Sequence, residues 1–143
     1  MKILICGAGQ VGYGIAEQLS IQKNDVTVID NSSDLINNIN KSLDVRTIKG
    51  NGSYPEVLDE AGAGDADVII AVTQFDEVNM VICHIAHILF NIPTKIARIR
   101  SNNFLNPEYE NLFTTDNIPI DVLISPEREI GESILKNLAL PGA

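Results

Sequence analysis

The sequence contains no tryptophan, only two cysteines and two histidines, and no long run of apolar residues. A helix that crosses a membrane needs roughly 18 consecutive apolar residues, and no stretch approaches this length, so direct membrane insertion is not expected. Cys6 and Cys83 lie in apolar segments and do not form a CxxC pair. This pattern predicts two buried, reduced thiols in a cytosolic protein.

Basic residues are scarce as well. The chain has 10 lysines and arginines against 19 aspartates and glutamates, which gives a net charge of -9 and an isoelectric point near 4.5. Such a surface repels DNA, RNA and anionic lipid headgroups, so no nucleic-acid partner is expected. A small anionic ligand is compatible with this charge, because nearby donors outweigh charges that salt screens beyond about 8–10 Å.

Short β-branched runs alternate with amphipathic segments along the 143 residues, enough for one domain. We expect strands at 2–6, 25–29, 45–49, 66–73, 94–100 and 120–124. We expect helices at 10–23, 32–42, 76–90 and 106–113, and a short helix that ends at about Glu60. A final helix is expected to run to about 140, with Ser125 as its N-cap and Pro126 as its first residue. Several strands are continuous apolar runs, as in a parallel sheet buried on both faces. The predicted fold is α/β: a Rossmann-like, doubly wound, six-stranded parallel sheet with helices on both faces.

A glycine-rich turn, "ICGAGQVGYG", follows the first expected strand and opens a helix. Gly7, Gly9 and Gly12 have the GxGxxG spacing, in which the first glycine allows a tight turn, the second lets backbone approach a pyrophosphate and the third lets helix and strand pack closely. The helix begins with Gln10 and Val11, and its N-terminus offers unpaired N–H groups to phosphates. We assign all five residues to a predicted nucleotide site.

Asp30 ends the second expected strand, 18 positions (30 minus 12) after Gly12. A carboxylate at this place accepts hydrogen bonds from both ribose hydroxyls and repels a 2′-phosphate, which favours NAD or an adenosine nucleotide over NADP. The next residue, Asn31, is assigned to the same site. The alternative is a capping or turn aspartate before "NSSD".

Groups suited to catalysis are hard to find. No tyrosine has a lysine four residues later, and no Ser/His/Asp arrangement sits in a plausible nucleophile turn. Cys83, His84 and His87 could be imagined as metal ligands, but a packed helix with two histidines is the favoured interpretation. We therefore expect no catalytic residue, and a protein that is not an enzyme.

The helix expected at 76–90 is apolar on two sides. One stripe, expected to face the sheet, consists of Val78, Val81, Ile82, Ile85 and Leu89. The opposite side holds Met80, Cys83, His87 and Phe90, with His84 beside them. A helix that is apolar on two faces has to bury both, so the second face is predicted to be a subunit interface.

Seven sequence segments are specific in combination: "GAGQVG", "VID", "GNGS", "ADVIIAVTQFDEVNMVICHIA", "KIARIR", "DVLISPE" and "LALPGA". On these, the chain resembles the N-terminal nucleotide-binding domain of Trk/Ktr potassium-uptake regulatory subunits (TrkA-N family), also called KTN or the N-lobe of an RCK domain. The resemblance implies one domain over 1–138, with 139–143 starting a linker to a C-terminal domain.

The same resemblance implies a function. Such subunits bind NAD(H) or ATP, ADP or AMP, assemble as homodimers and then rings, and gate a potassium channel or transporter from the cytoplasmic face of the plasma membrane. The sequence does not choose among these nucleotides, since Asp30 suits each of them.

The resemblance also implies further site residues. Asn51 would lie near the adenine, and Arg98 would reach phosphates. Thr73, Asp76 and Asn79 match the "T..D..N" signature that closes the ligand groove. Glu127, in "SPE", matches a position that helps to bind a divalent cation beside the nucleotide at a dimer interface.

Considered as residues alone, these positions leave alternatives open. Thr73 and Asn79 can donate hydrogen bonds to ribose or phosphate, whereas Asp76 and Glu77 also suit the first turn of a helix, near its positive end. Arg98 and Arg100 lie two apart on one expected strand and so face the same way. Arg98 is the favoured ligand arginine, and Arg100 is then a solvated edge charge.

Three other functions compete with a potassium-uptake sensor. The first is a fragment of an NAD-dependent oxidoreductase that lacks its catalytic domain. The second is the regulatory domain of a potassium efflux system, which shares this fold. The third is a purely structural dimerisation module, which would bind no nucleotide.

Overall fold

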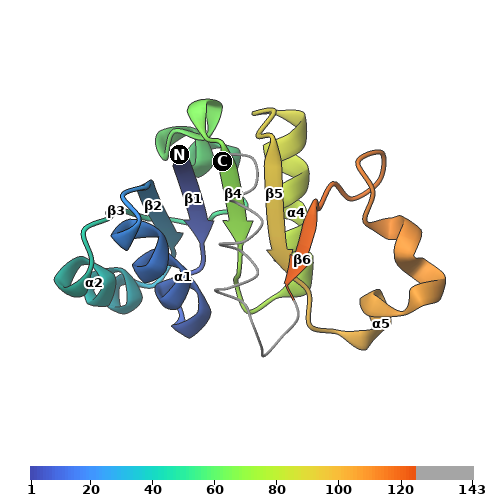
Figure 1. Ribbon diagram of the computed structural model, residues 1–143, viewed down its shortest axis with the longest axis horizontal. Coiled ribbons are helices and arrows are strands. Elements are labelled where there is room, and N and C mark those ends of the chain that lie inside the picture. The colour runs from blue at the N-terminus through green and yellow to red at the C-terminus, as the bar shows by residue number, and fades with distance from the viewer. Residues whose placement is uncertain (125–143) are drawn as a thin grey trace.

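A computed structural model of the chain describes residues 1–124. The strands are β1 (Lys2–Cys6), β2 (Asp25–Asp30), β3 (Arg46–Lys49), β4 (Val68–Ala71), β5 (Thr94–Arg98) and β6 (Val122–Ile124). All five strand pairs are parallel, in the order β3-β2-β1-β4-β5-β6 (Figure 1). The predicted Rossmann-like, six-stranded parallel sheet is therefore confirmed. The predictions for the helix from Ser125, for Glu127 and for a linker at 139–143 lie outside the described residues.

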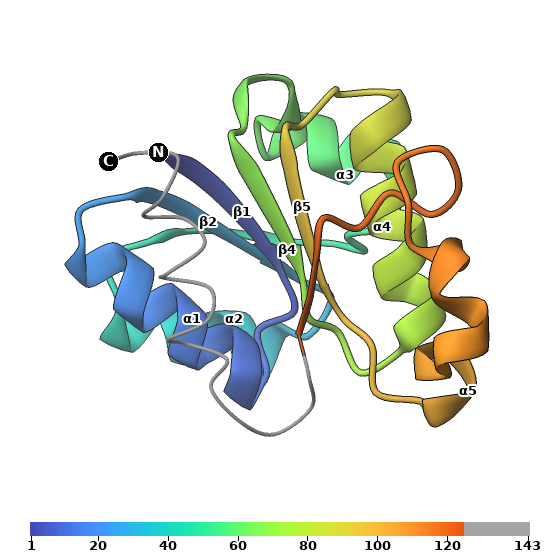
Figure 2. The ribbon, with the colours of Figure 1, turned by 45° about the vertical axis from the view of Figure 1, so that its right-hand side comes forward.

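Helices cover both faces of this sheet. They are α1 (Gln10–Ile21), α2 (Ser33–Ser42), α3 (Pro55–Glu60), α4 (Asp76–Ile88) and α5 (Asn102–Leu105), with short 3-10 helices η1 (Ala63–Asp65) and η2 (Pro107–Leu112). Figure 2 shows α1 and α2 on one side of the sheet and α3 and α4 on the other. None of the helices in this part of the chain is long and apolar enough to cross a membrane.

The core is split in two by the sheet. In β1, Leu4 and Cys6 belong to the cluster under α3 and α4, while Ile3 and Ile5 belong to the cluster under α1 and α2. Successive side chains of a strand point to opposite faces, so a strand that is covered on both sides must be apolar throughout. This is the physical reason that the runs in the sequence do not alternate with polar residues.

The polypeptide from 101 to 113 departs from prediction. A helix was expected at 106–113 and one is present at Pro107–Leu112, but it is the 3-10 helix η2, which follows the short α5. The side chain of Asn106 accepts a hydrogen bond from the Glu108 N–H, which places a cap where Pro107 begins the helix. Tyr109 has a non-helical backbone, so no continuous α-helix forms.

The predicted faces of α4 are also wrong in large part. The buried residues are Asp76, Asn79, Met80, Ile82, Cys83 and Ala86. Val81 and Leu89, which were expected to face the sheet, are 46% and 56% exposed. The rotation of the helix is set by Asp76 and Asn79, because these polar side chains are buried against the ends of β4 and β5. A projection that counts only apolar residues misses this constraint.

Both cysteines are free and buried, as predicted. Burial, together with the nearby Asp30, raises the pKa of the Cys6 thiol to about 12, and burial also raises the pKa of Cys83. Cys83 lies on the buried face of α4, whereas His84 is exposed on the outer side of the same helix. No group of metal-ligating residues occurs within residues 1–124.

The close approach of α1 to the turn that precedes it gives a test of the fold. A Cβ atom at Gly12 would lie 1.8 Å from the carbonyl oxygen of Gly7, whereas one at Gly14 would meet nothing within 4 Å. Gly12→Ala is expected to lower the free energy of unfolding by about 1–3 kcal/mol, as overpacking does. Gly14→Ala, in the same helix, should raise it by about 0.5–1 kcal/mol through helix propensity. Urea denaturation of both variants measures this, and equal effects would contradict the packing.

Candidate functional site

A cavity of about 720 Å³ opens at the carboxyl ends of the strands, where the strand order reverses between β1 and β4. This switch point is where ligands bind in open α/β sheets. The predicted site residues that line the cavity are Gly7, Gly9, Gln10, Val11, Asp30, Asn31, Asn51, Thr73 and Arg98. The other three predicted residues, Gly12, Asp76 and Asn79, do not line it, and Asp76 borders a smaller depression next to it.

The glycine loop forms the middle of the cavity. Gly7 has a φ of +117°, and a Cβ atom there would lie 2.6 Å from the carbonyl oxygen of Val72, so the turn and the end of β4 touch backbone to backbone. A Cβ atom at Gly9 would meet nothing within 4 Å, so this position opens into the cavity. No side chain caps α1, so its first N–H groups, at Gln10 and Val11, remain for a ligand.

Asp30 stands at the β2 side of the cavity. Its two carboxylate oxygens accept hydrogen bonds from the backbone N–H groups of Ala8, at 2.7 Å, and Ser32, at 2.8 Å. The hydrogen bond from Ser32 closes a local turn, so Asp30 also has the turn role that was given as the alternative for it. The turn does not exclude the nucleotide role, because each oxygen has a further lone pair with which to accept a ribose hydroxyl.

Asn51 occupies the neighbouring turn on the same side. Its Oδ1 accepts hydrogen bonds from the backbone N–H and the hydroxyl of Ser53, at 2.9 and 2.6 Å. The amide nitrogen is then the group that remains for a ligand. Gly52 follows, and a Cβ atom there would lie 3.0 Å from the Cys6 sulfur, so this turn sits directly on the end of β1.

The "T..D..N" residues divide between the cavity and its support. Asn79 is fully buried, and its Oδ1 accepts hydrogen bonds from the N–H and hydroxyl of Thr73 at 2.9 and 2.7 Å. Its Nδ2 donates to the carbonyl oxygen of Arg98 at 2.8 Å. The Asp76 carboxylate accepts from the backbone N–H groups of Arg100 and Ser101, at 2.9 and 2.8 Å. Of the three signature residues, only Thr73 faces the cavity.

Arg98 forms part of the opposite wall. It is only 9% exposed, and its Nη2 donates to the carbonyl oxygens of Thr73 and Val72, at 2.7 and 3.4 Å. Its Nε is buried without a hydrogen-bond partner. Burial lowers the pKa of the guanidinium, the charge of Arg100 lowers it further, and Asp76 acts in the opposite direction.

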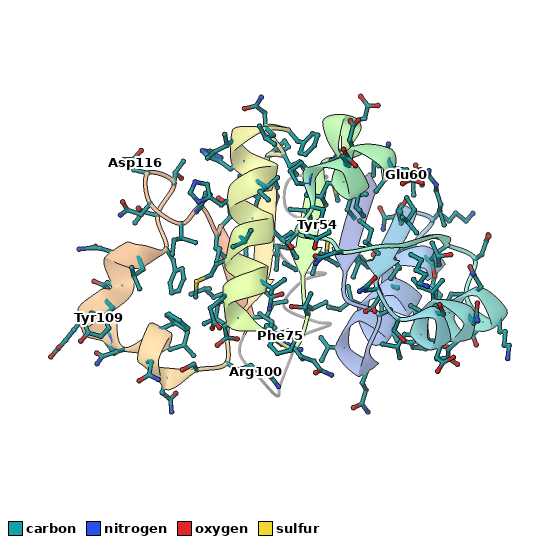
Figure 3. The ribbon with its side chains drawn as sticks, turned by 180° about the vertical axis from the view of Figure 1, so that it is seen from behind. Tyr54, Glu60, Phe75, Arg100, Tyr109 and Asp116 are labelled. Carbon is teal, nitrogen blue, oxygen red and sulfur yellow. The ribbon has the colours of Figure 1, made fainter. Side chains whose placement is uncertain are left out.

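Sequence reasoning missed several residues that line the cavity. Arg100 is exposed and donates to the carbonyl oxygen of Gln74, at 2.5 Å. Leu35, Phe75 and Val78 supply apolar surface. Figure 3 shows Phe75 and Arg100 near the same end of α4. Arg100 was assigned to a solvated edge because only one of the two arginines was expected to be the ligand arginine, whereas both line the cavity.

A family model described as the TrkA-N domain matches residues 3–126. The chain belongs to this family. It is 54% identical, over all 143 residues, to the Trk system potassium uptake protein TrkA of Azorhizobium caulinodans. The TrkA-N chain spans 31% of that protein's length.

Solved structures with low sequence identity share the fold. The TrkA-N domain of the inner membrane protein ybaL from Escherichia coli superposes with a TM-score of 0.75, at 22% identity and 96% coverage of both chains. The GsuK channel bound to NAD gives 0.70 at 18% identity, with 86% of this chain and 21% of that one covered. The Kef C-terminal domain of Shewanella denitrificans in its AMP-bound form gives 0.64 at 17% identity, with 100% and 83% covered.

The buried amide of Asn79 gives a prediction for this site. Asn79→Ala leaves the Thr73 N–H and the Arg98 carbonyl without their partner, so the free energy of unfolding should fall by about 2 kcal/mol or more. Asn103→Ala, at an exposed position of α5, should change it by less than about 0.5 kcal/mol. Chemical denaturation of the two variants makes the comparison, and an Asn79→Ala protein as stable as the wild type would contradict the network.

Proposed function

We propose that this chain is the nucleotide-sensing domain of a regulatory subunit of a potassium uptake system. It binds NAD(H) or an adenosine nucleotide (ATP, ADP or AMP) in the switch-point cavity. The observation that carries the proposal is the convergence of three groups on one cavity: the open glycine loop, the Asp30 carboxylate and the buried Arg98 guanidinium. Each is suited to a different part of a nucleotide.

The residues of the cavity fit such a ligand. The open space over Gly9 and the uncapped N-terminus of α1 suit a phosphate or pyrophosphate. Asp30 suits a ribose with a free 2′-hydroxyl, and Asn51 offers an amide N–H next to it. Arg98 lines the cavity, and its guanidinium offers positive charge to an anionic group of the ligand. The names of two neighbours of the same fold, bound to NAD and to AMP, agree with this ligand class.

The cavity offers no group for chemistry on a bound nucleotide. Its ionisable side chains, among the described residues, are Cys6, Asp30, Arg98 and Arg100. A thiol with a pKa of about 12 is neither a nucleophile nor an acid at neutral pH, and arginine does not give up its proton. Asp30 is committed to ribose. Such a cavity is common to a sensor and to an oxidoreductase fragment without its catalytic domain, and the membership of the TrkA-N family favours the sensor.

A sensor must transmit its state, and α4 supplies a surface for this. Val81, Ile88 and Leu89 of α4 are exposed. Figure 3 shows this helix at the front of the molecule, seen from its outer side. We propose that this apolar strip pairs with a second copy, giving the homodimer from which a larger ring is assembled on the inner face of the plasma membrane. Val81→Glu should shift sedimentation toward the monomer, whereas Ile21→Glu, at an exposed position of α1, should not.

Gating then follows from linkage. A nucleotide can shift the membrane-embedded potassium channel or transporter between two states only if it binds one state of the assembly more tightly. A tenfold difference corresponds to about 1.4 kcal/mol per site, and several sites in a ring would add up. A regulatory domain of a potassium efflux system is the second candidate, favoured by the likeness to the Kef domain, though at only 17% identity.

Isothermal titration with NADH, NAD+, ATP, ADP and NADPH tests the proposal. Binding of the adenosine ligands is expected to be micromolar, with NADPH much weaker because Asp30 repels its 2′-phosphate. Asp30→Ala should lower the affinity for the adenosine ligands at least about tenfold, which corresponds to about 1.4 kcal/mol of binding free energy. Asp44→Ala, which removes the same charge from an exposed loop, should leave them unchanged. Absence of binding by the wild-type chain to all five ligands would contradict the proposal.

A further inference from the structure

We propose that Asn51 is a site of spontaneous covalent modification, at which the turn after β3 converts the side-chain amide into a carboxylate. The co-reactant is water, and the leaving group is ammonia. This reactivity goes beyond the proposed function and does not depend on it, because the reaction needs only the residues of the turn and solvent.

The sequence of this turn sets Asn51 apart from the other asparagines. It is followed by Gly52, in "GNGS", and no other asparagine of the chain precedes a glycine. The backbone nitrogen of the next residue can attack the carbonyl carbon of an asparagine side chain and close a cyclic imide. A side chain on the attacking residue hinders this closure, and glycine has none and is conformationally free.

The side-chain carbonyl of Asn51 is polarised for such an attack. Its Oδ1 accepts hydrogen bonds from the backbone N–H of Ser53, at 2.9 Å, and from the Ser53 hydroxyl, at 2.6 Å. Negative charge develops on this oxygen when the carbon is attacked, so two donors aimed at it stabilise the tetrahedral intermediate, as an oxyanion hole does. Asn51 also lines the cavity, which gives water access to it.

The attacking nitrogen is free to react. The Gly52 N–H donates no hydrogen bond to any group within residues 1–124, whereas the Gly50 N–H donates to the carbonyl oxygen of Asp30, at 3.0 Å. The Ser53 N–H, on the other side, is taken by Asn51 itself. An N–H group without a partner loses its proton to hydroxide without first breaking a hydrogen bond.

Asn31 lies in the same cavity and provides the contrast. The next residue is Ser32, whose N–H donates to the Asp30 carboxylate at 2.8 Å. This nitrogen is therefore engaged, and Ser32 carries a side chain. Asn31 is expected to keep its amide in the folded chain, although both asparagines line one cavity.

The reaction balances without an oxidant or a reductant. The Gly52 nitrogen gives its proton to solvent and bonds to Cγ of Asn51, the Cγ–Nδ2 bond breaks, and Nδ2 leaves as ammonia with protons from water. Water then opens the cyclic imide. Attack at Cγ gives an aspartate, and attack at the main-chain carbonyl gives an isoaspartate, in which the backbone runs through Cβ. Either product replaces an amide donor by a carboxylate, which is an acceptor only, on the Asp30 side of the cavity.

Incubation of the folded chain in warm, mildly alkaline buffer tests the inference. Mass spectrometry should show a gain of about 1 Da, and peptide mapping should place it at Asn51 and not at Asn31. Ser53→Ala should slow the gain at least about threefold, because it removes one of the two donors to Oδ1. Ser42→Ala, at the exposed end of α2, is the matched control and should react at the wild-type rate.

The same measurements in urea separate the native turn from the bare sequence. In the unfolded chain, wild type and Ser53→Ala should react at similar rates, because the hydrogen bonds to Oδ1 are absent. A folded chain that gains no mass at Asn51 would overturn the inference, and so would equal rates for folded wild type and Ser53→Ala. A gain at Asn31 as fast as that at Asn51 would contradict the role of the free Gly52 N–H. The nucleotide titrations test the proposed function separately, so the two can fail independently.

Discussion

The side-chain amide of Asn79 is the contact on which one half of the candidate site depends. It ties three segments together: its own helix α4, the end of β4 through Thr73, and the end of β5 through the carbonyl of Arg98. A fully buried amide must have its hydrogen bonds satisfied, and here the backbone ends of two strands satisfy them. The rotation of α4, the orientation of Thr73 toward the cavity and the anchoring of Arg98 all follow from this arrangement.

The other half depends on close backbone packing. Gly7 touches the carbonyl of Val72, and Gly12 lies against the carbonyl of Gly7, so the turn, the helix α1 and the end of β4 fit together without side chains between them. Asp30 joins this unit through the Ala8 N–H. The two halves meet where the strand order reverses. The cavity between them has the Asp30 carboxylate on one side and the guanidinium groups of Arg98 and Arg100 on the other. This polarity suits a ligand with a hydroxyl-bearing end and an anionic or neutral end.

Much of this could be predicted from the sequence. Glycine spacing and the acid after the second strand reflect backbone geometry that few other residues satisfy, so these parts of the cavity were predicted residue by residue. The roles of Asp76 and Asn79 could not be, since a polar residue after a strand can bind either a ligand or the neighbouring backbone, and only the structure distinguishes these. The same buried amide explains why the face of α4 was predicted wrongly. Arg100 was set aside because one arginine was expected to be enough for the ligand, whereas both line the cavity.

The central claim is that an adenosine nucleotide occupies the switch-point cavity. Two-dimensional NMR of the isotope-labelled chain during titration with NADH tests it most directly, because each backbone N–H reports its own surroundings. The account predicts that the largest shifts occur at Gly9, Gln10, Asn31, Asn51 and Thr73, around the cavity. Shifts confined to residues at the amino ends of the strands, such as Asp44 and Asp67, or no shifts at millimolar NADH, would contradict it.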